Sequence, residues 1–121
     1  MSGLQIDILA HTEMVEFVCT GSLSFEEAIE LGEQIREVML KKPATDRILV
    51  DVSRAQVKID MMRRFMLGEF IAKNLAHIRI ALVAASGDIN KMVENTAVNR
   101  GASLYATHDR EAALSWLGQI T

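Results

Sequence analysis

The stretch ILVDVSRAQVKIDMMRRF, residues 48–65, decides which fold we expect for this chain. Three apolar residues lead into Asp51, Ser53 follows two positions later, and Asp60 precedes a segment rich in methionine. A short apolar run without polar alternation is typical of a strand that is covered on both faces of a parallel sheet. We therefore expect a buried strand that ends in a turn at Asp51 and Ser53. We also expect a helix over residues 60–75 that Asp60 caps.

The segments before this stretch predict a hairpin and a helix. Apolar and polar residues alternate over residues 4–8 and 15–20, as they do in half-buried strands. The short polar link between the two segments predicts that they pair antiparallel. Ser24 and Glu27 have the S-x-x-E spacing of a capping box, and Pro43 is expected to end the helix that they begin.

The segments after it continue an alternation of strands and helices. Residues 78–85 read as a buried strand, residues 88–100 as a helix, and residues 102–106 as a last strand. Thr107 or Asp109 is expected to cap a final helix. The order β-β-α-β-α-β-α-β-α predicts an α/β fold with a single mixed, mostly parallel sheet of about five strands and about four helices. We expect residues 1–121 to form one domain.

Composition and charge exclude several classes of protein. The net charge is −3 and the basic residues are scattered, whereas nucleic-acid-binding domains carry a clustered basic excess. The single cysteine, Cys19, excludes a disulfide within the chain and favours a reducing compartment. No signal-peptide pattern opens the chain, and no apolar run approaches the roughly 18 residues of a membrane span. We therefore expect a cytoplasmic protein that neither spans a membrane nor binds nucleic acid.

The motifs of most cofactor-dependent and catalytic proteins are missing. The sequence has no G-x-G-x-x-G or Walker-type loop after a strand and no G-x-S-x-G elbow. His11, His77 and His108 share no ligand spacing with Cys19, so no metal site is expected. Cys19 lies in the middle of an apolar strand, which favours a buried structural thiol over a nucleophile. We assign no catalytic residue, no metal and no cofactor.

In an open α/β sheet, ligands bind beyond the carboxyl ends of the parallel strands. The loops expected there contain Asp51, Ser53, Ser86 and Asp88, together with the segment 107–109. Such residues are commonly turn and cap residues. They could instead form a shared polar rim around a pocket.

The expected helix over residues 60–75 is unusually apolar. On a helical wheel at about 100° per residue, one side forms a face against the sheet, and the other side carries four further large apolar residues among charged ones. A neighbouring segment could cover them, a second copy of the protein could pack on them, or they could border a site for an apolar ligand. The sheet-facing set is Met61, Phe65, Gly68, Ala72 and Leu75; the additional set is Met66, Leu67, Phe70 and Ile71.

Three features of the chain resemble the STAS domain. They are the D-x-S at residues 51–53, the Ile59–Asp60 pair that opens a helix, and the C-terminal stretch RGASLYATHDREAALSWL, residues 100–117. The STAS family includes the anti-sigma-factor antagonists and the cytosolic domains of sulphate transporters. The chain is most similar to the small, mostly uncharacterised SpoIIAA-like (STAS/SEC14-like) bacterial proteins. The resemblance covers nearly the whole chain in the order of its elements.

The chain departs from this family at the position that carries regulation. In the antagonists a phosphorylated Ser follows the Ile-Asp pair, whereas here Met61 and Met62 follow it, and neither can accept phosphate. Ser53 is the only residue with a hydroxyl group in the stretch 48–65, and we do not expect it to be phosphorylated. The resemblance therefore implies a STAS-like module without the phosphorylation switch.

Three functions follow as hypotheses. The first is a non-enzymatic regulatory or protein-interaction module, acting as a homodimer or on a protein partner through the helix over residues 60–75. The second is a carrier or sensor of a small apolar, lipid-like ligand, as the SEC14-like side of the resemblance implies. The third, an enzyme that pairs Asp51 with His108 or Asp60 with Arg63, is disfavoured. The candidate residues for ligand or partner binding are Asp51, Ser53, Asp60, Met61, Met62, Phe65, Met66, Phe70, Ser86 and Asp88.

Overall fold

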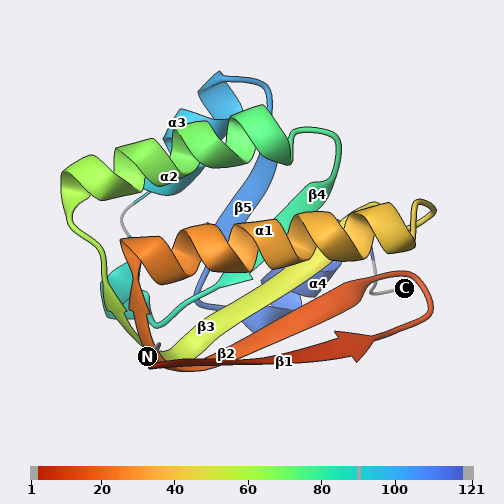
Figure 1. The fold of residues 1–121 in the computed structure, drawn as a ribbon, viewed down its shortest axis with the longest axis horizontal. Helices are drawn as coiled ribbons and strands as arrows, with labels where there is room; N and C mark the ends of the chain where they lie inside the picture. The colour runs from red at the N-terminus through yellow and green to blue at the C-terminus, as the bar shows by residue number, and fades with distance from the viewer. Residues whose placement is uncertain (1–2, 90, 119–121) are drawn as a thin grey trace.

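The alternation of strands and helices folds into one five-stranded sheet in the computed structural model, which describes residues 3–89 and 91–118. The strands follow the order β1-β2-β3-β4-β5 across the sheet (Figure 1). β1 pairs antiparallel with β2, and each later pair is parallel, so the predicted mixed, mostly parallel sheet is confirmed. The strands are β1 (Leu4–Ala10), β2 (Val15–Ser24), β3 (Arg47–Lys58), β4 (Arg79–Val83) and β5 (Ser103–Thr107).

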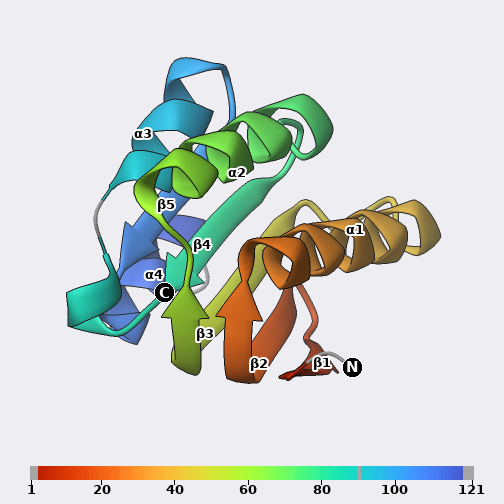
Figure 2. The same cartoon turned by 60° about the vertical axis from the view of Figure 1, so that its left-hand side comes forward.

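The helices are divided unequally between the two faces of the sheet. Three of them lie on one face and α4 lies on the other, as Figures 1 and 2 show. On the first face α2 packs between α1 and α3. The helices are α1 (Phe25–Lys41), α2 (Met61–Asn74), α3 (Met92–Asn99) and α4 (Arg110–Leu117), with a short 3-10 turn, η1 (Ser86–Asp88), after β4.

The predicted helix starts are confirmed in three cases. Ser24 and Glu27 form the reciprocal capping box of α1. The Asp60 carboxylate accepts a hydrogen bond of 2.9 Å from the backbone N–H of Arg63 and so caps α2. Asp109, rather than Thr107, caps α4. These caps satisfy N–H groups that have no partner within their own helix.

The helix expected over residues 88–100 begins later than the pattern predicted. α3 starts at Met92, because Lys91 adopts a left-handed backbone conformation with φ of 64° that interrupts the helical path. The Lys91 ammonium then donates to the Ala106 carbonyl at 2.9 Å, which ties the start of α3 to β5.

The prediction that β3 ends at Asp51 and Ser53 is wrong. β3 continues to Lys58, and its second half pairs with the second half of β2. The register shifts where the Asp51–Ser53 segment lies, so the strand carries an extra residue there, as in a β-bulge. One carboxylate oxygen of Asp51 accepts from the Ser53 N–H at 2.9 Å and from the Ser53 hydroxyl at 2.6 Å. This local pair stabilises a bulge within the strand instead of a turn at its end.

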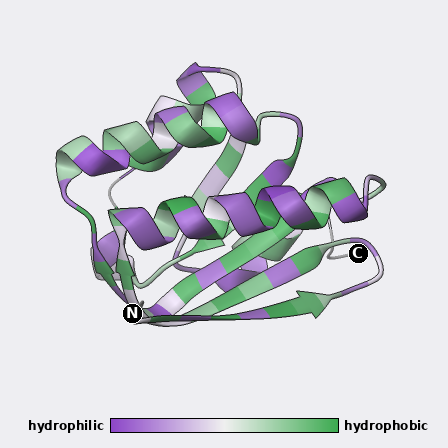
Figure 3. Ribbon diagram, viewed as in Figure 1, coloured by the Kyte–Doolittle hydropathy of each residue, from purple (hydrophilic) through white to green (hydrophobic). Residues whose placement is uncertain are grey.

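The two faces of the sheet enclose two hydrophobic clusters. The larger lies under α1, α2 and α3, and the smaller lies under α4 around Leu49, Ala81 and Leu117. Hydrophobic residues run along the central strands, while α1 carries hydrophilic bands on its outer side (Figure 3). No helix within residues 3–89 and 91–118 has the length and apolar character needed to cross a bilayer.

Candidate functional site: an apolar cavity beside helix α2

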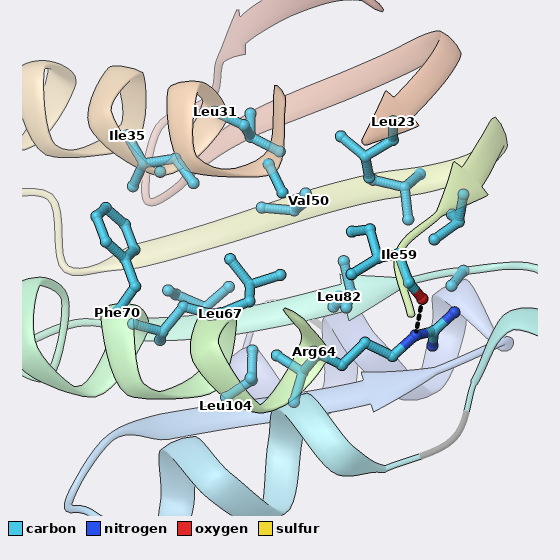
Figure 4. Close-up of a pocket in the computed structure, with 18 of the residues that line it drawn as sticks. Leu23, Leu31, Ile35, Val50, Ile59, Arg64, Leu67, Phe70, Leu82 and Leu104 are labelled. Atoms are coloured by element: carbon cyan, nitrogen blue, oxygen red, sulfur yellow. Dashed lines mark hydrogen bonds between the residues drawn. The ribbon is translucent and has the colours of Figure 1, made fainter. Parts of the chain in front are cut away.

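An apolar cavity of about 110 Å³ lies between the sheet and the two helices α1 and α2. Side chains from these helices and from four strands point into it (Figure 4). β2, β3, β4 and β5 provide the floor, α1 and α2 provide most of the walls, and Val93 of α3 adds to them. The labelled lining residues are Leu23, Leu31, Ile35, Val50, Ile59, Arg64, Leu67, Phe70, Leu82 and Leu104.

α2 packs tightly against α3 on the side of the helix that carries Gly68. Gly68 of α2 is buried against α3, where an added Cβ would lie 2.6 Å from the Thr96 Cβ and 2.9 Å from the Val93 carbonyl oxygen. Only glycine allows this distance. On its other side α2 meets α1 through the ring of Phe70, and the space between these helices is left incompletely filled.

The lining of the cavity suits an apolar occupant. Arg64 and Asp88 are the only polar side chains among the described residues that line it. A buried water needs two to four polar partners, so this void offers water few favourable positions. Unfilled volume beside a core lowers stability, so apolar atoms placed in this space would be favourable.

Arg64 closes the end of the cavity near the carboxyl ends of the strands. Its Nε donates to the Ile59 carbonyl and its Nη1 to the Asp88 carbonyl, both at 2.8 Å. The guanidinium thus connects the β3–α2 junction with η1 (Figure 4). Of the two predicted site residues in this loop, Asp88 lines the cavity, whereas Ser86 is exposed.

Phe70 borders the opposite end. Its ring lies against Gly32 of α1, where an added Cβ would come within 2.5 Å of a ring carbon. Phe70 also lines a groove on the outer surface between α1 and α2, which Phe25, Ile29 and Met66 share. One aromatic side chain therefore separates the groove from the cavity.

The structure corrects the predicted orientation of α2. Leu67, Phe70 and Ile71, which the helical wheel placed away from the sheet, line the cavity. Met61, which the wheel placed against the sheet, is 53% exposed. The reason is that α2 has a helix on each side, so its buried arc is wider than that of a helix that touches only a sheet. Among the additional residues, Met66 is exposed.

The remaining candidates on α2 lie outside the cavity. Met62 is exposed and Asp60 forms a 2.6 Å ion pair with Arg63 in open solvent. Phe65 faces α3, where the Arg100 guanidinium lies 5.1 Å from its ring centroid. The Asp60–Arg63 pair therefore belongs to the helix cap, and its exposed position offers no enclosed site for catalysis.

Asp51 and Ser53 lie on the α4 side of β3, away from the cavity. There Asp51 approaches Arg110, with 3.7 Å between Oδ2 and Nη1. Arg110 binds Glu16 at 2.7 Å, and His11 also contacts Glu16 at 3.1 Å. The predicted pocket rim that would unite Asp51 and Ser53 with Ser86 and Asp88 thus does not form. We call His11, Glu16, Asp51, Ser53 and Arg110 the α4-side polar cluster.

Glu16 is the centre of the α4-side polar cluster and was not predicted. Only 4% of it is exposed, and the Arg110 hydrogen bond is the main reason that its carboxyl pKa lies below the ordinary value, against the opposing effect of burial. The alternation of apolar and polar residues in β2 marks Glu16 as a polar position, but no local pattern predicts a partner 94 residues later. Its carboxylate is held by two partners, so it reads as a structural ion pair.

The thiol of Cys19 and the arrangement of possible metal ligands can also be described. Cys19 is fully buried, and burial followed by the nearby Asp51 charge raises the pKa of its thiol to about 12. It is therefore a structural thiol, as predicted. Within the described part of the chain, no group of three or more histidine, cysteine or acidic residues is arranged to hold a metal ion.

Comparisons with known proteins identify the fold. No protein-family model and no curated protein matches the chain significantly. Solved structures do match it over nearly its whole length. An anti-sigma factor antagonist from Mycobacterium paratuberculosis aligns with a TM-score of 0.64 at 15% identity, covering 95% of this chain and 94% of that one.

Two other structures agree with this match. The anti-sigma factor antagonist SpoIIAA in its unphosphorylated form aligns with a TM-score of 0.58 at 16% identity, over 98% of this chain and 99% of that one. An uncharacterised DUF3478 protein with a SpoIIAA-like fold from Shewanella loihica aligns with a TM-score of 0.50 at 17% identity, over 95% and 94%. The chain therefore has the SpoIIAA-like fold, as the sequence motifs implied.

Proposed function

We propose that this protein is a non-enzymatic regulatory module that binds another protein chain through the N-terminal half of α2. The observation that carries the proposal is the exposure of Met61, Met62 and Met66, at 53%, 69% and 44%. We call these three residues the methionine face. Met62 and Met66 are four residues apart and so lie on the same side of the helix. Methionine is common on surfaces that adapt to a partner, and exposed apolar groups concentrated in one place mark such sites.

The fold supports this proposal. The two solved structures named as anti-sigma factor antagonists share the fold over nearly the whole chain, and such proteins oppose another protein. The charged side chains of the α4-side polar cluster are engaged with one another, which fits a structural role better than acid–base chemistry. The buried Cys19 fits a reducing compartment, and we propose the cytoplasm.

We further propose that this module works without phosphorylation at α2. Its first two helical residues, Met61 and Met62, have no hydroxyl group. The Ser53 hydroxyl donates to the Asp51 carboxylate at 2.6 Å, and a phosphate there would be repelled by that carboxylate. Regulation would then depend on whether the partner is present and not on a covalent mark.

The test is the oligomeric state of the purified protein and of a variant, measured by analytical ultracentrifugation across micromolar concentrations. A concentration-dependent dimer that the double variant Met62→Glu/Met66→Glu abolishes would identify a second copy as the partner. Leu40→Glu is the matched control, because Leu40 is 75% exposed at the end of α1, outside the methionine face. A dimer that persists in the double variant would refute this surface as the dimer interface.

A monomeric wild type would leave a different protein as the partner. Cross-linking from a photoreactive methionine analogue in cells would then be expected to capture one discrete protein in the wild type and in Leu40→Glu. Loss of that product in Met62→Glu, in which Met66 still carries the analogue, would support the proposal. Absence of any discrete product from the wild type would refute it.

The carriage or sensing of a small apolar molecule is a second candidate function. One observation favours it, the cavity of about 110 Å³ beside α2. An engineered cavity of roughly 150 Å³ lined by similar residues binds benzene. The present volume thus suits a compact molecule and not a long lipid chain. Native mass spectrometry of freshly purified protein, repeated after denaturation, would reveal a carried ligand as an extra mass that is lost on denaturation.

A further inference from the structure

We infer that the cavity is a binding site for a compact, uncharged apolar molecule about the size of benzene, and that Phe70 is the gate through which it enters. This inference rests on the second candidate function and assigns to it a site, an entrance and a size of ligand. It is independent of the methionine face.

The class of ligand follows from the walls of the cavity. The side chains that enclose it are aliphatic apart from Phe70, Arg64 and Asp88. The Arg64 guanidinium donates to two backbone carbonyls, those of Ile59 and Asp88. A charged or strongly polar ligand would lose its hydration without gaining matching partners. An apolar molecule has no such hydration to lose, and it would fill the void.

The size of the ligand follows from the volume. The void measures about 110 Å³, and most of the wall residues belong to helices and strands. Cavities of this order hold a single small ring or a few carbon atoms. Longer chains would need α1 and α2 to separate.

The side chains that border the two ends of the cavity differ in how firmly they are held. At one end Arg64 makes two charge-assisted hydrogen bonds of 2.8 Å to different segments, and both must break before that end opens. At the other end Phe70 makes apolar contact with Gly32 and is partly exposed. Rotation of a partly exposed side chain is fast and breaks no side-chain hydrogen bond. The Phe70 end therefore opens first.

The surface outside Phe70 leads to this gate. Phe70 lines both the cavity and the groove between α1 and α2, whose other apolar side chains are Phe25, Ile29 and Met66. Rotation of the Phe70 ring away from Gly32 would join groove and cavity into one apolar path. Gly32 leaves room for the ring in this position, because a Cβ there would lie 2.5 Å from a ring carbon and the ring would have to shift.

The experiment is a titration of the methyl-labelled protein with benzene, followed by NMR. Saturable shifts are expected at methyls that line the cavity, such as those of Leu67, Ile71 and Leu82. Ala28→Leu extends a side chain from α1 into the void and should abolish them. Val57→Leu tests the same point from β3, in case the first variant does not fold. Absence of saturable shifts in the wild type, or their persistence in both filled variants, would overturn the site.

The gate is tested by the exchange rate of bound benzene. Phe70→Leu should accelerate the exchange of bound benzene by about tenfold, which corresponds to an opening barrier that is lower by about 1.4 kcal/mol. Phe65→Leu is the matched control, since Phe65 lies on the same helix but faces α3 and does not line the cavity. Acceleration by Phe65→Leu but not by Phe70→Leu would overturn the gate. Benzene binding without any carried mass in the native protein would count against the carrier function alone, and not against the site.

Discussion

At the scale of the residue, the role of a polar side chain depends on which partner the fold brings to it. Asp51 and Ser53 have the composition of a turn, yet their mutual hydrogen bonds stabilise a bulge inside a long strand. Asp60, by contrast, caps α2 as its position predicts, because its partner is only three residues away. Glu16 is the opposite case, since Arg110 is remote in sequence. Local partners were therefore predictable and distant ones were not.

We predict that Glu16→Gln lowers the free energy of unfolding by about 1.5–3 kcal/mol at pH 7, the usual contribution of a charge-assisted hydrogen bond. The Arg110 hydrogen bond lowers the Glu16 pKa below its ordinary value of 4.5. The folded state therefore holds this proton less tightly than the unfolded state does. The resulting stability is present above about pH 4.5 and is lost as the pH falls through the lower, folded pKa.

Urea denaturation across this pH range measures the effect. The difference between wild type and Glu16→Gln should shrink as the pH falls below about 4.5. Glu13→Gln is the control, because Glu13 is mostly exposed and lies 3.9 Å from Arg47, so its loss should change little. A difference that stays constant from pH 7 to pH 3 would refute the ion pair as its source.

At the scale of the element, α2 is controlled by contacts along both of its sides. Gly68 allows close packing on α3, while Phe70 bridges to Gly32 on α1. The sequence predicted the span and the cap of this helix, and it correctly signalled that the helix carries more apolar surface than a single sheet contact needs. It misplaced the buried face, because the wheel assumed one neighbour where the fold supplies two helices and a sheet.

We predict that Arg64→Met destabilises the protein by about 1.5–3 kcal/mol, because it removes two charge-assisted hydrogen bonds that join the start of α2 to η1. The adjacent Arg63→Met is the control. Arg63 makes its side-chain pair with Asp60 in open solvent, so its loss should cost less than about 1 kcal/mol. Midpoints of urea denaturation compare the two. Equal losses in both variants would show that Arg64 acts as an ordinary surface charge.

At the scale of the whole molecule, the arrangement of helices leaves the protein with an internal void. Three helices share one face of a five-stranded sheet (Figure 2). The space between α1 and α2 is bordered at its ends by Phe70 and Arg64 and is not packed throughout. Internal voids disappear when a protein unfolds, so the total volume of protein and water decreases on unfolding. Such a protein unfolds more readily under pressure.

We predict that Ala28→Leu raises the pressure at which the protein unfolds. A void of 110 Å³ corresponds to at most about 66 mL/mol of the volume decrease on unfolding, within the range that folded domains show. Filling it should reduce that decrease. High-pressure fluorescence of Trp116 would follow the transition, and Leu40→Ala, on the solvent side of α1, is the control. An unchanged volume of unfolding would show that the added side chain does not occupy the cavity.

The sequence by itself determined the order of the elements, the mixed parallel sheet, the caps at Ser24 and Asp60, and the SpoIIAA-like fold that the fold comparison shows. These features depend on periodicity and on partners a few residues apart. Only the tertiary structure decided the extension of β3, the buried face of α2, the α4-side polar cluster and the cavity. Each of these depends on segments that lie far apart in the chain, and on how closely two helices can approach when a glycine or an aromatic ring stands between them.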